Sequence, residues 1–197
     1  QTFLTFPNNW GLGTSSTLVN NIAQWAAVDA YQLLQNSFSG SGYDIANAQH
    51  NLPILYQLKN KKPLIKTVDF SPQFSDQLYF VYLNKKQNSR EGIAKYKENN
   101  DDFKNEIHRI SEISLEMCSV KSLLDFERLI EEHEQIIASI IKLKPVKELL
   151  FPDYQGAIKS LGAWGGDFVL VTGNKSTLQY FKEKGYETIL SYSNMVL

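Results

Sequence analysis

The sequence predicts an α+β fold, and three observations support this prediction. Short apolar runs rich in β-branched and aromatic residues indicate strands, for example at 78–83 and 168–172. Longer stretches carry apolar residues at helical spacing, above all at 18–35 and 120–142. The second half alternates strand, helices, strand, helix and strand, and no internal repeat is visible. We therefore expect a two-layer α+β sandwich in that half.

The first half is expected to contain a strand, two helices and two further strands. In chain order they are predicted at 2–6, 18–35, 43–50, 54–58 and 64–70. Glycine- and serine-rich residues 36–42 separate the two helices, and Pro53 ends the second one. The connector at 72–76 is the best candidate for a domain boundary.

The second half is expected to hold most of the helices. Its strands and helices are predicted at 78–83, 89–98, 101–117, 120–142, 168–172, 174–184 and 187–191. The helix at 120–142 also has a charged face, which we interpret as a solvated surface. That face consists of Glu127, Arg128, Glu131, Glu132 and Glu134.

Composition excludes several classes of protein. The chain has 197 residues, 43% hydrophobic and 21% charged, as in ordinary globular proteins. A net charge of −1 gives no electrostatic reason to expect nucleic acid or an anionic membrane as partner. The single cysteine, Cys118, cannot form an internal disulfide, and it fits a reducing compartment. With no membrane-spanning run and no signal-peptide pattern, a cytoplasmic location is expected.

A glycine- and hydroxyl-rich loop follows the first apolar run. It reads Pro-Asn-Asn-Trp-Gly-Leu-Gly-Thr-Ser-Ser-Thr over residues 7–17. Gly11 and Gly13 allow positive φ angles, so that successive amides can turn toward one anion. Thr14, Ser15 and Ser16 add hydroxyls at a helix start, where the dipole favours phosphate. A plain helix cap explains the same residues, and the lysine of a Walker A loop is absent.

Two further glycine-rich segments carry carboxylates. The first, Ser39 to Ala46, reads Ser-Gly-Ser-Gly-Tyr-Asp-Ile-Ala and delivers Asp44 at a helix start. A first-turn acid that interacts with the helix dipole is the simpler interpretation of Asp44. The second, Lys159 to Asp167, reads Lys-Ser-Leu-Gly-Ala-Trp-Gly-Gly-Asp and runs into a strand. A tight turn is its simpler interpretation.

Taken together, the three segments resemble the phosphate loop, the second motif and the third motif of the GHMP kinases. This superfamily includes galactokinase, homoserine kinase, mevalonate kinase and phosphomevalonate kinase. The resemblance implies binding of ATP and Mg²⁺, with Ser15 as the metal ligand. It also implies that Asp44 faces the phosphoryl acceptor, as the catalytic base or as the electrostatic partner of a lysine. The nucleotide-binding residues that it implies are Gly11, Leu12, Gly13, Thr14, Ser15, Ser16, Gly162, Gly165 and Gly166.

The resemblance also implies a domain organisation. Residues 1–74 correspond to part of a ribosomal-S5-domain-2-like N-terminal domain, and 75–197 to the ferredoxin-like α/β sandwich of the C-terminal domain. Family members have several strands before the phosphate loop, with a first motif that holds a functional lysine. We therefore expect this chain to be incomplete as an enzyme, with an open face beside 2–6 and 54–70.

Some residues depart from the family pattern. Leu161 and Trp164 are bulkier than the family's residues in the third motif, and Trp164 is expected to narrow the cleft. Asp167 resembles the phosphomevalonate kinase form of this motif. A weaker match at 82–91 resembles the segment by which family members reach the acceptor. Lys85, Lys86 and Lys159 are the available cations for the cleft, although a surface lysine is the simpler interpretation of each.

The resemblance implies an ATP-dependent kinase of a small metabolite, with mevalonate or phosphomevalonate as the first candidates. A homoserine or sugar kinase of the same superfamily is one alternative. A catalytically silent relative that binds a metabolite or a partner is another. The expected partner is a small phosphoryl acceptor, and a homodimer is compatible with this interpretation.

Overall fold

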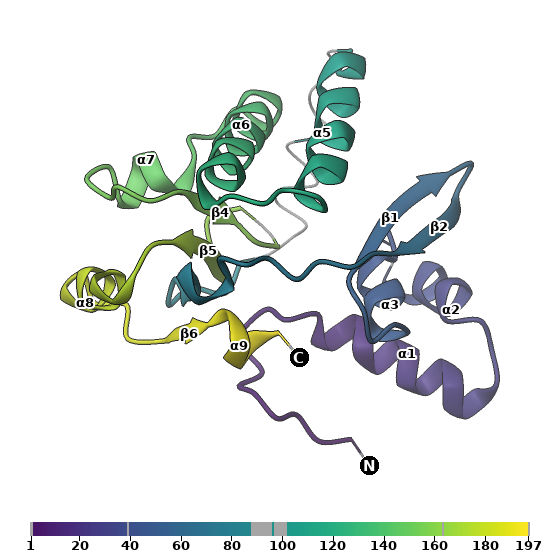
Figure 1. Ribbon diagram of the computed structural model, residues 1–197. Coiled ribbons are helices and arrows are strands. Elements are labelled where there is room, and N and C mark those ends of the chain that lie inside the picture. Colours follow the sequence, from purple (N-terminus) through teal and green to yellow (C-terminus); the bar gives the residue numbers. More distant parts are fainter. Residues whose placement is uncertain (1, 39, 88–95, 97–101, 163, 197) are drawn as a thin grey trace. The chain divides into compact units, whose positions relative to one another are not determined.

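The structure is a computed structural model that describes residues 2–38, 40–87, 96, 102–162 and 164–196 (Figure 1). The chain divides into two compact units. One is continuous, Leu12–Phe70, and the other combines Gln1–Gly11 with Ser71–Leu197. Both contain helices and strands, so the chain is α+β as predicted.

The unit Leu12–Phe70 packs three helices and a β-hairpin. Its elements are α1 (Thr14–Ala26), α2 (Ala30–Ser37), α3 (Tyr43–Ala48), β1 (Ile54–Lys59) and β2 (Lys62–Thr67). The strands are antiparallel, and Asn60 and Lys61 between them have φ values of 52° and 62°. Positive φ at both turn residues gives the twist that a two-residue hairpin needs. The helices share a small core of Val19, Ala23, Ala30, Leu34 and Ile45.

The single helix expected at 18–35 is wrong, because the chain forms two helices there. Helix α1 ends at Ala27, whose φ of 53° lies in the left-handed region. Asp29 then begins α2, with its side chain accepting a hydrogen bond from the Gln32 N–H at 2.7 Å. An aspartate cap of this kind is a common start signal, and it restarts the helix after the break.

The strand expected at 2–6 is also absent from the structure. These residues have no strand hydrogen bonds, and the side chains of Phe3 and Leu4 are exposed. A β-leaning run forms a strand only where another strand pairs with it. In the described part of the chain, β1 and β2 pair with each other and leave Leu58 and Leu64 about half exposed.

The second unit is built on a four-stranded antiparallel sheet in the order β4-β5-β3-β6. Its strands are β3 (Leu78–Tyr82), β4 (Ile158–Ser160), β5 (Phe168–Thr172) and β6 (Ile189–Ser191). Its helices are η1 (Ser75–Gln77), α5 (Lys104–Met117), α6 (Leu123–Ile141), α7 (Val146–Leu150), α8 (Lys175–Glu183) and α9 (Tyr192–Met195). Helices α5 and α6 pack against each other, and α6 also contacts β4 (Figure 1). Most of the helix expected at 89–98 lies outside the described residues.

The core of this unit lies between the sheet and the segments around α7 and α8. Every residue of β3 and β5 is buried, as expected for their continuous apolar runs. Alternate residues of the two strands face the same core, whose members are Tyr79, Val81, Leu83, Val146, Phe151, Tyr154, Ile158, Val169, Val171 and Phe181. The two central strands therefore hold their end loops on a well-packed base.

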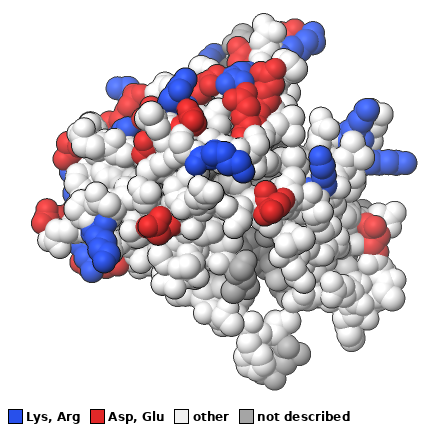
Figure 2. All heavy atoms as spheres, in the orientation of Figure 1, with Lys and Arg blue, Asp and Glu red and all other residues white. Residues whose placement is uncertain are grey.

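Charge is distributed without a dominant sign. On the face drawn in Figure 2, basic and acidic side chains are interspersed. The first charged residue of the sequence is Asp29, so α1 and the loop before it carry no charged side chain. Among the described residues, no helix is both long and apolar enough to cross a membrane.

Candidate functional site

The glycine loop before α1 has the backbone shape that its composition predicts. Gly11 has φ 69° and Gly13 has φ 67°, both in the left-handed region. Gly13 is the N-cap of α1, and having no side chain it cannot cap the N–H groups of the first turn. Those groups have no partner within the helix. They are available to an anion, as are the hydroxyls of Thr14, Ser15 and Ser16 at the helix start, of which Ser15 is exposed.

Asp44 lies against this helix start, within the unit Leu12–Phe70. A Cβ atom built on Gly13 would lie 3.6 Å from the Asp44 carboxyl carbon, so the two residues are in contact distance. Asp44 occupies the first turn of α3, after Gly42 with φ 84°. Burial raises the pKa of the Asp44 carboxyl above its usual value. The segment 39–46 thus places the Asp44 carboxylate beside the glycine loop that precedes α1.

The turn that carries Asp44 is held by two tyrosines. The Tyr56 hydroxyl donates a hydrogen bond to the Ser41 carbonyl. The Tyr31 ring lies where a side chain on Gly42 would be, 2.9 Å from the position of its Cβ. The hairpin and α2 therefore fix the glycine turn from which α3 starts.

In the other unit, the first glycine of the loop meets the end of the third motif. A Cβ on Gly11 would lie 2.2 Å from the carboxyl carbon of Asp167, so only glycine fits there. Asp167 is 7% exposed and has φ 54°, a left-handed value that is uncommon outside glycine. Trp10, next to Gly11, packs edge-on against Phe168, with 5.3 Å between the two ring centroids. Two segments more than 150 residues apart in sequence are thereby brought together.

The third motif is also tied to the turn that follows β3. The Asp167 N–H donates to the Lys85 carbonyl at 2.7 Å, and the Gln87 N–H donates to Asp167 Oδ1 at 3.2 Å. Gly166 has no room for a side chain, because a Cβ would lie 2.6 Å from Cβ of Gln87. Burial raises the pKa of Asp167, and the Gln87 hydrogen bond and the charge of Lys86 oppose that shift.

The remaining third-motif glycines have open surroundings. Gly162 has φ 63°, and Gly165 has φ 89° with no neighbouring atom within 4 Å of a built Cβ. Trp164 is partly buried, and its role in narrowing the cleft stays a prediction. Residues 88–91 of the expected acceptor segment lie outside the described residues.

The three candidate lysines differ in their surroundings. Lys85 and Lys86 are exposed, beside Asp167. The Lys159 Nζ atom instead lies 3.7 Å from Glu134 Oε1 and 3.4 Å from Nδ1 of His133. Burial lowers the pKa of the Lys159 amine, and Glu134 opposes this shift. Lys159 therefore pairs with the buried Glu134 carboxylate, and its use as a cation for the cleft stays a prediction.

Sequence reasoning missed the role of Glu134. We expected it on a solvated face, but it is 3% exposed, and Glu127 on the same face hydrogen-bonds the buried Thr172 hydroxyl. Glu134 Oε2 accepts the Ser160 N–H at 3.0 Å. Its position one turn from the apolar Ile130 is a signal that could have placed it on the inner face.

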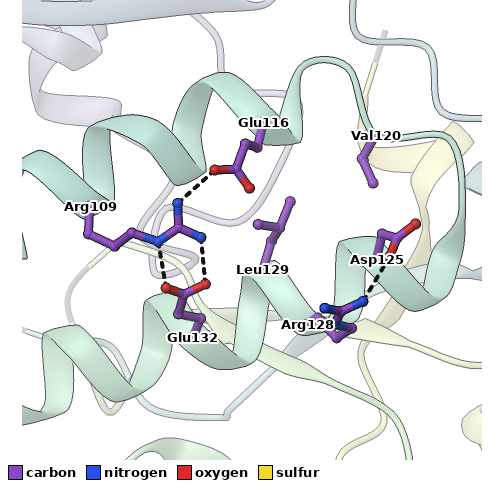
Figure 3. Close-up of a pocket in the computed structure, with 7 residues that line it drawn as sticks. All are labelled: Arg109, Glu116, Val120, Asp125, Arg128, Leu129 and Glu132. Carbon is purple, nitrogen blue, oxygen red and sulfur yellow. Dashed lines mark hydrogen bonds and ion pairs between the residues drawn. The ribbon is translucent and has the colours of Figure 1, made fainter.

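A hollow of about 270 Å³ lies beside α5 and α6 (Figure 3). Arg109 from α5 makes two hydrogen bonds to Glu132 of α6, at 2.5 and 2.7 Å, and a third to Glu116 at 2.6 Å. The charges that line the hollow are thus paired with one another. We interpret these ion pairs as structural contacts that hold α5 and α6 together. Neither here nor in the rest of the described residues is there a group of three or more histidine, cysteine or acidic side chains that could hold a metal ion.

Comparisons with known proteins support the fold. No family model matches the sequence. No curated protein matches it either. Among solved structures, the Lin0012 protein from Listeria innocua is similar with a TM-score of 0.67 and 16% identity, over 92% of this chain and 66% of that one. L. major mevalonate kinase, in complex with R-mevalonate, is similar with a TM-score of 0.57 and 16% identity, over 91% of this chain and 64% of that one. The chain therefore has a mevalonate-kinase-like fold and spans about two thirds of the length of these neighbours.

Proposed function

We propose that this chain is part of an ATP-dependent kinase that phosphorylates a small metabolite, with mevalonate or phosphomevalonate as the first candidates. The observation that carries the proposal is the pairing of glycines and carboxylates from separate motifs. Gly13 lies beside Asp44, and Gly11 lies against Asp167. The structural similarity to L. major mevalonate kinase supports the same class of reaction.

The loop at 11–16 is proposed to hold the phosphates of ATP. Its positive φ angles and the uncapped first turn of α1 supply N–H donors, and the helix dipole favours negative charge there. No acidic side chain lies between residues 1 and 28 to repel the phosphates. Gly162, Gly165 and Gly166, in the turn that ends beside Gly11, are proposed to add backbone contacts.

The donor set also fits Mg²⁺. This ion prefers oxygen ligands and usually keeps several waters while it bridges substrate phosphates. When bound, it neutralises the charge that develops on the transferred phosphoryl group. The exposed Ser15 hydroxyl in the first turn of α1 is the proposed protein ligand.

Asp44 is proposed to act on the acceptor. Its carboxylate can accept the proton of an acceptor hydroxyl as the new P–O bond forms. The raised pKa makes this carboxylate a better proton acceptor than an exposed aspartate. Its contact with Gly13 places the base next to the proposed phosphate loop.

The test is a screen of acceptors with the full-length protein, read as ADP release with Mg·ATP. Mevalonate, phosphomevalonate, homoserine and simple sugars cover the alternatives. Release of ADP with one of them identifies the acceptor, and loss of that signal in Asp44→Asn ties it to this site. Nucleotide binding without turnover of any acceptor would favour a silent relative. Absence of both binding and turnover would overturn the proposal.

A further inference from the structure

We infer that Tyr56 is a positioning residue, whose hydroxyl fixes the turn before α3 and so holds the Asp44 carboxyl group beside Gly13. The inference rests on the proposed function, because this position affects turnover only if Asp44 acts on the acceptor. Every residue that the inference uses belongs to the unit Leu12–Phe70.

The position of Asp44 depends on how α3 is held at its two ends. This helix has only six residues, and no side chain hydrogen-bonds its first turn from the N-cap, Gly42. A helix of this length is not stable by itself, so its direction is set by the contacts around it. Ile45 and Ala46, which follow Asp44, are fully buried and hold the inner face of the helix.

Side chains from two other elements hold the turn that leads into α3. Tyr56 of β1 donates its hydroxyl hydrogen to the carbonyl oxygen of Ser41. Gln35 of α2 donates its side-chain amide to the carbonyl oxygen of Gly40 at 2.9 Å. Two successive carbonyl groups of the turn are therefore fixed, one by the hairpin and one by α2.

The same tyrosine also borders Gly42, the residue after this pair of carbonyls. A Cβ on Gly42 would lie 3.4 Å from the Tyr56 hydroxyl oxygen and 2.9 Å from a ring carbon of Tyr31. Gly42 has φ 84°, and it is two residues before Asp44. A shift of the turn is therefore passed directly to the first turn of α3 and to its carboxylate.

The far end of α3 is tied to the helix that the glycine loop precedes. Gln49, the C-cap of α3, donates its side-chain amide to Asn20 Oδ1 at 3.0 Å, and Asn20 of α1 is 2% exposed. With this end fixed on α1, the contacts at the turn decide how closely Asp44 approaches Gly13. Displacement of a catalytic group by about 1 Å can cost about a hundredfold in rate.

Tyr56→Phe tests the inference, because it removes the hydroxyl and keeps the ring. Tyr180→Phe is the matched control, since it removes a tyrosine hydroxyl that donates to Asp153 in the other unit. Two quantities are measured on the full-length protein. The pKa of Asp44 is followed by carboxyl ¹³C NMR without substrate, and kcat and KM for Mg·ATP are measured with the acceptor that the screen identifies.

In Tyr56→Phe, the pKa of Asp44 should fall toward its ordinary value, because the carboxyl group becomes less buried. The acid limb of the kcat profile should move to lower pH with it. Turnover should fall about tenfold to a hundredfold, while KM for Mg·ATP stays unchanged. Tyr180→Phe should match wild type in all of these measurements.

An unchanged Asp44 pKa in Tyr56→Phe would overturn the inference, whatever the activity. Wild-type kcat in this variant would overturn it too, and so would a loss of kcat that the Tyr180 control shares. If wild type phosphorylates no acceptor, the proposed function is wrong. A lowered Asp44 pKa in Tyr56→Phe would still support the hold of Tyr56 on Asp44 in that case.

Discussion

The carboxylate of Glu134, in the middle of α6, accepts the backbone N–H of Ser160 at 3.0 Å. Ser160 is the last residue of β4, which is one of the two edge strands of the sheet among the described residues. Edge strands leave backbone groups unpaired, and here a buried side chain satisfies one of them. Because Gly162 follows two residues later, the same contact also anchors the start of the glycine turn.

Glu134→Ala should destabilise the protein by about 3 kcal/mol, since it removes the carboxylate that pairs with the partly buried Lys159 amine and accepts the Ser160 N–H. Urea unfolding measures this loss. Glu131→Ala is the matched control on the same helix, because its ion pair with Lys147 is more exposed and should contribute about 1 kcal/mol or less. Equal losses in the two variants would show that the Glu134 contacts contribute no more than a surface pair.

Gly11→Ala should lower the melting temperature more than Gly185→Ala. Both glycines have positive φ, 69° and 88°, and alanine at either should cost about 1–2 kcal/mol of backbone strain. A Cβ at Gly185 meets nothing within 4 Å, whereas one at Gly11 collides with Asp167, which adds about 1–3 kcal/mol.

The double variant Gly11→Ala/Asp167→Gly separates these two effects. Removing the Asp167 side chain frees the space, so most of the additional loss should be recovered. If Gly11→Ala costs no more than the Gly185 control, or the double variant recovers nothing, the close contact does not exist in solution.

The predictions of secondary structure from the sequence were most accurate where a single residue pattern dominated a segment. The continuous apolar runs at 78–83 and 168–172 form the buried central strands, because such runs are satisfied only between two covered faces. The break at Ala27 was missed, because the Ala-Ala-Val that precedes Asp29 contains neither glycine nor proline. The cap at Asp29 was the available sign of a new helix.

The candidate site was predictable in its motifs but not in its contacts. Glycine spacing indicated positive φ at Gly11 and Gly13, and the structure has it. No local pattern indicates that Asp167 occupies the space beside Gly11, because that contact depends on packing between distant segments. The same holds for Lys159, whose lysine–glutamate pairing with α6 is invisible in its own segment.

Ser15→Ala should weaken use of Mg·ATP and leave the fold intact. A hydroxyl contact to a charged ligand contributes about 1.5–3 kcal/mol, so kcat/KM for the nucleotide should fall roughly tenfold to a hundredfold. Steady-state kinetics with varied Mg·ATP give this number. Ser176→Ala is the control, because it removes a first-turn hydroxyl from α8, and it should leave kcat/KM for the nucleotide unchanged. Unaltered nucleotide kinetics in Ser15→Ala would remove this hydroxyl from the mechanism.

Asp44→Asn should reduce turnover strongly without harming the fold. Loss of a general base costs roughly a hundredfold to ten-thousandfold in kcat, and asparagine preserves size and much of the capping ability. Asp29→Asn is the matched control in the same unit, because Asp29 caps α2 through the Gln32 N–H and is exposed. Its kinetics should equal those of wild type.

The raised pKa of Asp44 predicts how stability and kcat/KM should depend on pH in the wild type and in Asp44→Asn. Burial raises the folded-state pKa of Asp44 above the unfolded value, so the folded state holds this proton more tightly. The stability linked to that proton is present below the unfolded pKa and is lost as pH rises through the folded pKa. At neutral pH, Asp44→Asn should therefore melt at the same temperature as wild type or at a higher one.

The acid limb of the wild-type kcat/KM profile should lie above the ordinary aspartate range and be absent from the variant. Normal turnover in Asp44→Asn, together with a lower melting temperature, would leave Asp44 only a structural role at the start of α3.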